Sequence, residues 1–526
     1  MQQLAWWQTG IIYQIYPRSF QDTNNDGIGD LNGILQRLDH LVDLGIDAVW
    51  ISPIYPSPMA DFGYDISNYC DIDPTYGNLA EFDRLIARIH ALGMKLILDF
   101  VPNHTSNQHP WFLDSRSSTT SSKRDWYLWR DPAPDGGPPN NWTSQFGGSA
   151  WELDPTTGQY YLHSFLKEQP DVNWRNPELC AAMFNVLRFW LGRGVDGFRV
   201  DVMWLLIKDD KFRDNPPNPG YHPGDPDNQK YISVYNSNRP ETLKIVEDMR
   251  SLLDSYSNKL LIGEIYLPSE QLVAYYGDSL DGAQLPFNFH LLQTAWAAEP
   301  LFKTIGEYFA ALPKGAWPNW VLGNHDQHRI ASRVGDAQAR VAAMLLLTLW
   351  GTPTVYYGEE LGMTDVPIPP GEVQDPAEKN QPGLGQGRDP ERTPMPWDSS
   401  QLAGFTGGKP WLRLGADHIE VNVAKLSAEP GSMLDLYRRL IALRRKSPAL
   451  TSGTFEELHV QGDVLIYERQ HQSERLAIYL NTRHDQQQVS AKSGRILLST
   501  NLDRGGEVVS TSLTLSPAEG IILTLD

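Results

Sequence analysis

The 526-residue chain contains only two cysteines, Cys70 and Cys180, which excludes a disulfide scaffold. A reducing compartment, the cytoplasm, is therefore the expected location. The first residues, MQQLAWWQTG, lack the basic and apolar segments of a secretory signal, so we expect none. The longest apolar run, AAMLLLTLW at 342–350, falls short of the ~20 residues that span a bilayer. We predict that it forms a buried helix.

Positive charge is also scarce. The chain has 44 Lys and Arg residues but 64 Asp and Glu residues, which gives a net charge of −20. Such a polyanion repels nucleic-acid phosphates and acidic membrane surfaces, so neither is expected as a partner. The composition, with 41% hydrophobic residues, is that of a folded globular protein. The length exceeds what one compact core can organise and predicts two or three domains.

Short apolar runs alternate with amphipathic helical segments along most of the chain. Most runs are apolar on both faces, as expected for parallel strands that lie between helices. Helical segments such as 31–45 and 78–93 each end in glycine, a common C-terminal cap. Eight successive β/α units predict a (β/α)8 TIM barrel rather than an open sheet. The predicted strands are 11–17, 46–52, 95–102, 196–202, 259–266, 283–289, 319–326 and 352–360.

A long stretch between the third and fourth predicted strands interrupts this pattern. It is rich in Ser, Pro, Gly and Trp, and we predict that 105–174 forms an inserted subdomain. The barrel would then consist of 1–104 and 175–454. After it, 455–526 alternates between apolar and polar residues and predicts a C-terminal antiparallel β-sandwich.

Two further irregular inserts, 208–231 and 363–410, follow the fourth and eighth strands. All three inserts thus leave the barrel at the C-terminal ends of strands. Barrel enzymes keep their active sites on that face.

Charged and polar side chains end several of these strands. Asp201 and Arg199 share one face of their strand, so the arginine would keep Asp201 ionised, as a nucleophile requires. A second carboxyl in a drier place can keep its proton and act as an acid, and such a pair is what glycoside hydrolysis needs. For any one of these charged residues taken alone, the alternative to a catalytic role is that it caps a helix or lies on the surface. The strand ends carry Asp99, Asn103 and His104 (DFVPNH), Arg199 and Asp201 (GFRVD), Glu264 (GE), and His325 and Asp326 (NHD).

These four motifs resemble the ordered signature regions of the α-amylase superfamily of glycoside hydrolases. Within it the chain resembles the α-glucosidase and oligo-1,6-glucosidase group, whose additional motif is similar to QPDVNW at 169–174. The resemblance covers nearly the whole chain. By position it implies that Asp201 is the nucleophile, Glu264 the general acid/base and Asp326 the transition-state stabiliser.

The same resemblance implies a pocket for one terminal glucose. Asp65 in GYD and Arg392 in ERTPMPW would grip the far hydroxyl of that glucose and close the pocket, so that single glucose units leave chain ends. Phe146 and Phe165 would line the pocket, although a core role is an alternative. The remaining sugar-binding residues would be Tyr64, as a stacking ring, with His104, Arg199 and His325.

The segment DTNNDGIGD (22–30) has the oxygen-bearing residues and glycine of the first part of an EF-hand loop. Position 12 is Gly33 instead of the bidentate Glu, so a sensor motion is not expected. In the resembled group this loop binds a structural Ca²⁺ or Mg²⁺, and a turn without an ion is the alternative. The implied ligands are the side chains of Asp22, Asn24, Asp26 and Asp30 and the carbonyl of Ile28.

Some positions depart from the family pattern and leave the linkage preference open. Val202 resembles oligo-1,6-glucosidases, whereas maltose-preferring relatives often carry Thr, a swap worth about 1–3 kcal/mol of discrimination. Trp204 and Pro396 stand where many relatives have Asn and Gln. The expected partners are a small α-glucoside or a sugar acceptor, and the protein would be a monomer or a homodimer.

Two other functions fit the same scaffold. A transferase or isomerase would move glucose to a sugar or alcohol instead of water, but the RLDRD-type motif of sucrose isomerases is not found here. The inactive heavy chains of some amino-acid transporters also share the fold. Those chains carry a membrane span, which the sequence lacks, and here every catalytic position is kept.

Overall fold

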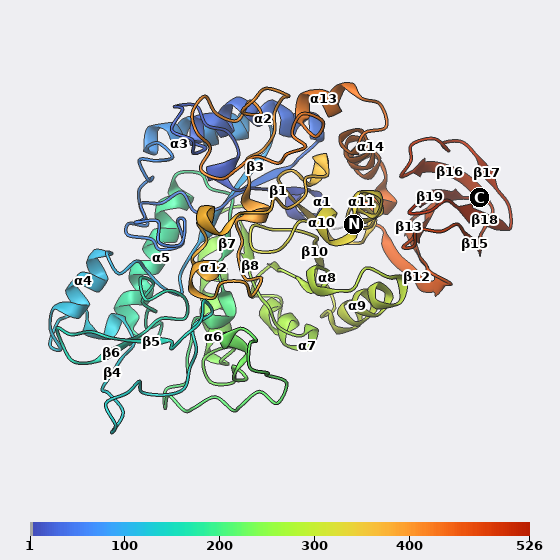
Figure 1. Ribbon diagram of the computed structural model, residues 1–526. Helices are drawn as coiled ribbons and strands as arrows, with labels where there is room; N and C mark the ends of the chain where they lie inside the picture. The colour runs from blue at the N-terminus through green and yellow to red at the C-terminus, as the bar shows by residue number, and fades with distance from the viewer. Residues whose placement is uncertain (1–3) are drawn as a thin grey trace.

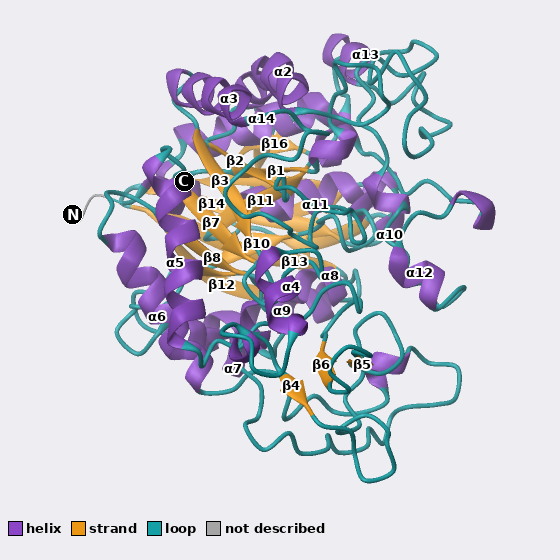
Figure 2. Ribbon diagram, turned by 90° about the vertical axis from the view of Figure 1, so that its left-hand side faces the viewer, coloured by secondary structure: helices purple, strands orange, loops and turns teal. Residues whose placement is uncertain are grey.

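The computed structural model describes residues 4–526, and a parallel eight-stranded sheet curls into a nearly closed barrel at its centre (Figures 1 and 2). The strands follow the order β10-β11-β1-β2-β3-β7-β8-β9, and all eight lie within the predicted runs. The predicted TIM barrel is therefore confirmed. The strands are β1 (Ile12–Ile15), β2 (Ala48–Ile51), β3 (Lys95–Phe100), β7 (Gly197–Val200), β8 (Leu260–Gly263), β9 (Leu285–Pro286), β10 (Asn319–Val321) and β11 (Thr352–Tyr356).

The apolar strands divide their side chains between two cores. Ile12, Trp50 and Ile97 pack together inside the barrel, whereas neighbours such as Tyr13 and Val49 face the surrounding helices. Alternate side chains of a strand point to opposite faces, so burial on both sides demands a run without polar gaps. This is why the barrel strands could be recognised from the sequence.

The helices surround the barrel, as Figure 2 shows. Asp30 caps the N-terminus of α2 by accepting a hydrogen bond from Gly33 N, and Gly45 ends it at a φ of 89°. The apolar run at 342–350 begins within α11, where the side chains are buried, as predicted. Within residues 4–526 no helix is long and apolar enough to cross a membrane. The longer helices are α2 (Leu31–Leu44), α3 (Leu79–Ala91), α4 (Pro110–Ser117), α5 (Pro177–Gly192), α6 (Glu241–Asp254), α9 (Ala298–Ala311), α11 (Asp336–Thr348) and α14 (Met433–Lys446).

Shorter helices complete these connections. They are α1 (Trp6–Thr9), α7 (Ser269–Leu272), α8 (His290–Gln293), α10 (Ile330–Val334), α12 (Pro376–Asn380), α13 (Val423–Ala428) and α15 (Pro448–Thr451).

The stretch 105–174 leaves the barrel after β3 and contains α4 and a small antiparallel sheet of β4 (Trp129–Arg130), β6 (Tyr160–Leu162) and β5 (Trp151–Leu153). This sheet and the C-terminal strands lie on opposite sides of the barrel in Figure 1.

The three inserts meet one another although they are far apart in sequence. Asp227, in the second insert, accepts a hydrogen bond from Gly148 N of the first insert at 2.9 Å. The backbone N–H of Asp227 donates to Gln381 Oε1 of the third insert at 3.0 Å. These contacts build one wall beside the C-terminal ends of the barrel strands.

From Thr454 onward the chain forms antiparallel strands that pack around their own core. A six-stranded sheet has the order β12-β13-β14-β19-β16-β17, and β15 pairs with β18 in a second, two-stranded sheet. The predicted C-terminal antiparallel domain is thus present. Its strands are β12 (Thr454–Gln461), β13 (Val464–His471), β14 (Glu474–Asn481), β15 (Gln487–Ser490), β16 (Gly494–Ser499), β17 (Val508–Val509), β18 (Ser512–Leu515) and β19 (Gly520–Leu525).

Candidate active site

A cavity of about 430 Å³ opens where the barrel strands end and the inserts meet. Most of the residues predicted for catalysis and sugar binding line it. Arg199 lies directly behind them, whereas Asp65 and Arg392 do not reach the cavity wall. The predicted residues that line the cavity are Tyr64, His104, Phe146, Phe165, Asp201, Glu264, His325 and Asp326.

Arg199, on β7, is the hub of the carboxylate cluster and is fully buried. Its Nη1 lies 2.7 Å from a carboxylate oxygen of Asp99 and 2.8 Å from one of Asp201. Its Nη2 lies 2.8 Å from Glu264 Oε2. Two carboxylates from neighbouring strand ends are thus held side by side by one guanidinium group, because β7 and β8 are adjacent in the barrel.

The backbone between the two carboxylates is strained. Val202 has a φ of 39° and a ψ of 47°, a left-handed conformation that β-branched residues rarely adopt. In this conformation its N–H donates to Glu264 Oε2 at 2.8 Å. The strain is thus associated with a contact that orients the Glu264 carboxyl group.

The sequence predicts that Arg199 keeps Asp201 ionised, but burial outweighs the charge of Arg199 and raises the pKa of Asp201 well above its ordinary value. Burial raises the pKa of both groups, and the charge of Glu264 raises that of Asp201 further, while Arg199 opposes the rise in each. Two such carboxyls titrate as a pair. A pair that carries one proton offers one carboxylate that can attack and one acid that can donate, which is the division of roles that glycoside hydrolysis requires.

Asp326 stays ionised in the same cavity. Burial opposes ionisation of its carboxyl, but its cationic neighbours hold its pKa below the ordinary value. Arg392 Nη2 lies 2.8 Å and Arg388 Nη1 3.3 Å from the same Asp326 oxygen. A fixed negative charge here can stabilise positive charge that develops on a bound sugar.

Two buried histidines line the cavity as neutral donors or acceptors. Burial lowers the pKa of His325 well below its ordinary value and that of His104 to about 4. The His325 ring stacks on Tyr64 with centroids 5.4 Å apart, and its Nε2 lies 2.7 Å from the Tyr64 hydroxyl oxygen. Gln14, from β1, holds the other ring nitrogen at 2.8 Å.

The prediction that Asp65 and Arg392 close the pocket is wrong. The Asp65 carboxylate is fully buried and accepts hydrogen bonds from Ala60 N and Asp61 N at 2.9 and 3.0 Å. Arg392 is buried beneath the cavity, where its Nε donates to the His325 carbonyl oxygen at 2.6 Å. Asp65 therefore holds the backbone of its turn, and Arg392 holds the Asp326 carboxylate. Neither residue faces the cavity.

The pair that lines the cavity is Asp61 and Arg388, each four residues before its predicted counterpart. Arg388 Nη2 lies 2.7 Å from Asp61 Oδ1, and its guanidinium carbon lies 4.9 Å from the centre of the Phe146 ring. Both members of the pair are largely buried, since 4% of the Asp61 side chain and 12% of the Arg388 side chain are exposed. The turn capped by Asp65 is what presents Asp61 to the cavity.

A family model described as the catalytic domain of α-amylase matches residues 14–453. The chain belongs to the α-amylase family. It is 42% identical to a probable α-glucosidase of Rhizobium meliloti over 90% of this chain and 89% of that protein. It is 40% identical to an oligo-1,6-glucosidase of Heyndrickxia coagulans over 90% of this chain and 92% of that protein.

Solved structures agree with this assignment. The α-glucosyl transfer enzyme XgtA superposes with a TM-score of 0.94 and 38% identity over the whole of both chains. The trehalulose synthase MutB of Pseudomonas mesoacidophila superposes with a TM-score of 0.92 and 35% identity, also over both complete chains. The chain is thus an α-amylase-family glycoside hydrolase whose structural neighbours include enzymes that transfer glucosyl groups.

Two aromatic residues of this α-amylase-family cavity were not assigned from the sequence. Trp204 follows the Asp201 strand end, Tyr266 follows Glu264, and both line the cavity. Their rings meet edge to face with centroids 5.6 Å apart. These two rings form an aromatic part of the wall of the cavity that also contains Glu264.

The loop at 22–30 is organised by hydrogen bonds from its own side chains to its backbone. Asp22 accepts hydrogen bonds from Asn24 N at 2.9 Å and from Gly27 N at 2.8 Å, and Asn24 Oδ1 accepts one from Asp26 N at 2.9 Å. These bonds fix the conformation of the loop. Carboxylate, amide and carbonyl oxygens are the ligands that Ca²⁺ and Mg²⁺ prefer, so the donor set fits such an ion.

Proposed function

We propose that the protein is a retaining, exo-acting α-glucosidase that releases α-glucose from the non-reducing ends of short α-glucosides. The observation that carries this proposal is the pair of carboxylates, Asp201 and Glu264, on adjacent nitrogens of one buried guanidinium group. Retaining enzymes place their two carboxyls closer together than inverting enzymes, which leave room for water between them. The Asp61–Arg388 pair supports the exo mode, since it walls the same cavity.

In the proposed reaction Asp201 attacks the anomeric carbon while Glu264 donates its proton to the leaving oxygen, so the glycosidic bond breaks as the ester bond forms. Glu264, now a carboxylate, takes a proton from water. As this proton is removed, the water oxygen attacks the same carbon, and the ester bond breaks so that Asp201 leaves as a carboxylate. Asp326 stabilises the positive charge on the sugar ring during both steps. Two inversions give α-glucose.

Transfer to a sugar or alcohol is the second candidate, because the XgtA and MutB structures belong to transfer and isomerisation enzymes. The same glucosyl intermediate serves both outcomes, and the acceptor decides between them. Incubation with maltose, isomaltose and sucrose, followed by chromatography of the products, distinguishes the two. Free glucose as the main product supports hydrolysis, whereas trehalulose, isomaltulose or longer glucosides as main products support transfer.

The exo mode makes a prediction for soluble starch. We expect release of glucose from maltose- or isomaltose-sized substrates and very slow action on starch, because an internal glucose has no free terminal hydroxyl for the closed end of the cavity. Starch viscosity and product size are the measurements. A rapid fall in viscosity with mixed long oligosaccharides would contradict the pocket.

Replacing Asp61 or Arg388 by Ala is expected to lower kcat/KM on short α-glucosides by about 10²-fold or more, which is ~2.7 kcal/mol in the transition state. Arg388→Ala leaves the Asp61 carboxylate buried without its ion-pair partner, which costs several kcal/mol, whereas Asp61→Ala removes one of the three carboxylates that hold Arg388 at the cavity. The matched control is Arg413→Ala, because Arg413 and Glu372 form an ion pair whose side chains are 42% and 53% exposed. Equal effects of the buried and exposed replacements would refute the assignment.

We also propose that the 22–30 loop holds a structural Ca²⁺ or Mg²⁺. Asp22 Oδ2 accepts a hydrogen bond from the Thr406 hydroxyl at 2.5 Å, so the loop links the first barrel strand to the insert after the eighth. Chelation is expected to lower Tm by about 3 °C or more, since an ion bound only to the folded state stabilises it by mass action. Most activity at moderate temperature should remain. Loss of turnover without a change in Tm would mean that the ion is catalytic.

A further inference from the structure

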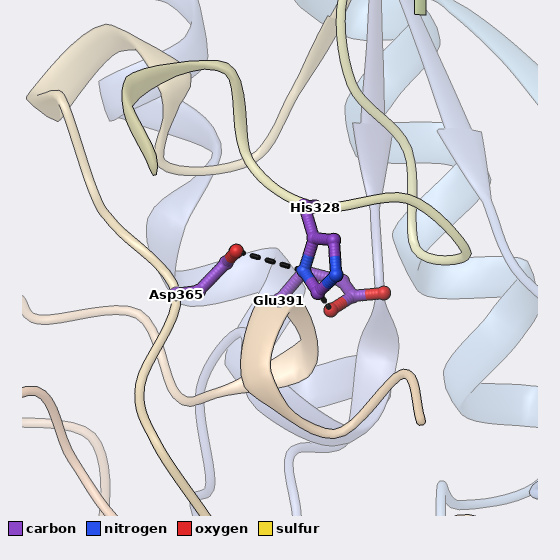
Figure 3. A group of neighbouring side chains, drawn as sticks. All are labelled: His328, Asp365 and Glu391. Carbon is purple, nitrogen blue, oxygen red and sulfur yellow. Dashed lines mark ion pairs between the residues drawn. The ribbon is translucent and has the colours of Figure 1, made fainter. Parts of the chain in front are cut away.

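A second group of potential metal ligands lies in the wall of the same cavity, apart from the catalytic carboxylates. His328 follows β10, Asp365 lies in the insert after β11, and Glu391 lies beside the buried Arg392. Figure 3 shows the His328 ring between the two carboxylates. His328 Nδ1 lies 2.9 Å from Asp365 Oδ2 and 3.8 Å from Glu391 Oε2. One ligand atom from each residue lies within 4.8 Å of the other two.

Glu391 is the residue that a simple ion pair does not explain. Only 1% of its side chain is exposed, and within residues 4–526 its Oε2 has no hydrogen-bond partner. No Lys or Arg nitrogen of the described chain lies within 4.0 Å of its carboxylate. Burial, with a further contribution from Asp365, raises its pKa well above the ordinary value. A buried carboxyl without a partner, aimed at an imidazole, is costly unless a ligand completes it.

Asp365 and His328 each present one atom to Glu391 and are accessible in ways that suit a common ligand. Asp365 Oδ1 accepts a hydrogen bond from Arg329 N at 2.9 Å, which leaves Oδ2 for the cluster. The His328 side chain is 52% exposed, so a cation and its water can enter from the cavity side. Arg392, the nearest guanidinium in sequence, is engaged by Asp326 instead of by Glu391.

We propose that His328, Asp365 and Glu391 bind a divalent transition-metal ion such as Zn²⁺. Imidazole nitrogen and carboxylate oxygen are both ligands of Zn²⁺, and the imidazole separates this group from the all-oxygen sets of Ca²⁺ and Mg²⁺. Metal–ligand distances of about 2.0–2.2 Å require ligand atoms roughly 3–3.6 Å apart, and the observed separations of 2.9 and 3.8 Å bracket that range. Small side-chain rotations suffice, and water fills the open position.

The site would act on the neighbouring active site. His328 is two residues from Asp326, and both His328 and Glu391 line the cavity. A bound cation changes the charge of this wall and occupies space beside the substrate. We therefore expect Zn²⁺ to inhibit turnover. Metal binding itself does not depend on the proposed glucosidase activity and is measured separately from it.

The test is calorimetric titration of chelator-treated full-length protein with Zn²⁺ in the presence of excess Ca²⁺, which keeps the 22–30 loop from contributing. We expect one equivalent to bind. Glu391→Gln, which preserves shape, and His328→Gln should each weaken binding by about tenfold or more. His222→Gln is the matched control, because exposed His222 faces Asp225 at 3.6 Å without a third ligand.

Co²⁺ provides a second readout, since its visible absorption reports an inner-sphere site of low coordination number. The spectrum should appear with the wild type and the His222→Gln variant and be lost with Glu391→Gln, while an unchanged Tm shows that this variant is folded. Absence of saturable Zn²⁺ binding would overturn the proposal. Zn²⁺ binding of unchanged affinity in the His328→Gln and Glu391→Gln variants would also overturn it, because the cluster would then be an ion pair only.

Discussion

Replacing Asp201 by Asn is expected to lower kcat/KM on a short α-glucoside by at least ~10⁴-fold. The amide keeps the shape of the carboxylate and can still accept a hydrogen bond from Arg199, which lies 2.8 Å away in the parent chain. It cannot form the glycosyl ester on which the proposed reaction depends. Stopped assays with an aryl α-glucoside measure the loss, and mass spectrometry should detect no covalent adduct.

The control for this replacement is Asp196→Asn. Asp196 is a similarly buried carboxylate at the opposite end of β7, where it bonds to Leu96 N and lies 2.7 Å from His90 Nε2. The Asp196→Asn replacement can destabilise the barrel, but the folded fraction of the variant should keep most of the activity. Activity above about 1% of the parent in Asp201→Asn, with folding intact, would show that Asp201 is not the nucleophile.

Replacing Glu264 by Gln is expected to have the second largest effect, and the size should depend on the leaving group. General acid catalysis contributes about 10²–10⁴-fold, so maltose-type substrates should lose that factor in kcat/KM. Aryl glucosides with acidic phenols need no proton and should form the intermediate at nearly the normal rate. That intermediate should then accumulate, because the base that activates water is missing.

Azide identifies the two roles by stereochemistry. With Glu264→Gln, azide should attack the β-glucosyl ester at Asp201, release the carboxylate and give α-glucosyl azide. With Asp201→Gly, azide should displace the leaving group of the α-glucoside directly and give the β-anomer. The reverse pattern would exchange the assignments of the two residues. Equal loss on all leaving groups would mean that Glu264 only holds Arg199.

The barrel could be predicted because its strands are buried on both faces and leave an unbroken apolar signal. The carboxylates at the strand ends could be placed for the same reason, since a strand fixes where its last residue points. Residues on loops carried less information. Asp61 and Asp65 flank one turn. Asp65 faces away from the cavity because its carboxylate accepts hydrogen bonds from two backbone N–H groups of that turn.

Arg388 and Arg392 pose the same problem in the insert after β11. Both approach the same Asp326 oxygen, but ion pairs with Asp61 and Asp375 and packing against Phe146 hold Arg388 at the cavity. The positive φ of Val202 also had no local signal, because a β-branched residue does not favour it. It arises from contacts between two strand ends. Such features depend on tertiary structure, and local sequence patterns do not encode them.

Proton NMR of the first minutes of hydrolysis tests the double displacement at Asp201 and Glu264 most directly. The anomeric protons of α- and β-glucose give separate signals, and early spectra precede mutarotation. The account predicts that α-glucose appears first and that the β-anomer grows only as the mixture equilibrates. β-Glucose as the first product would mean a single inversion by water and would contradict the covalent intermediate.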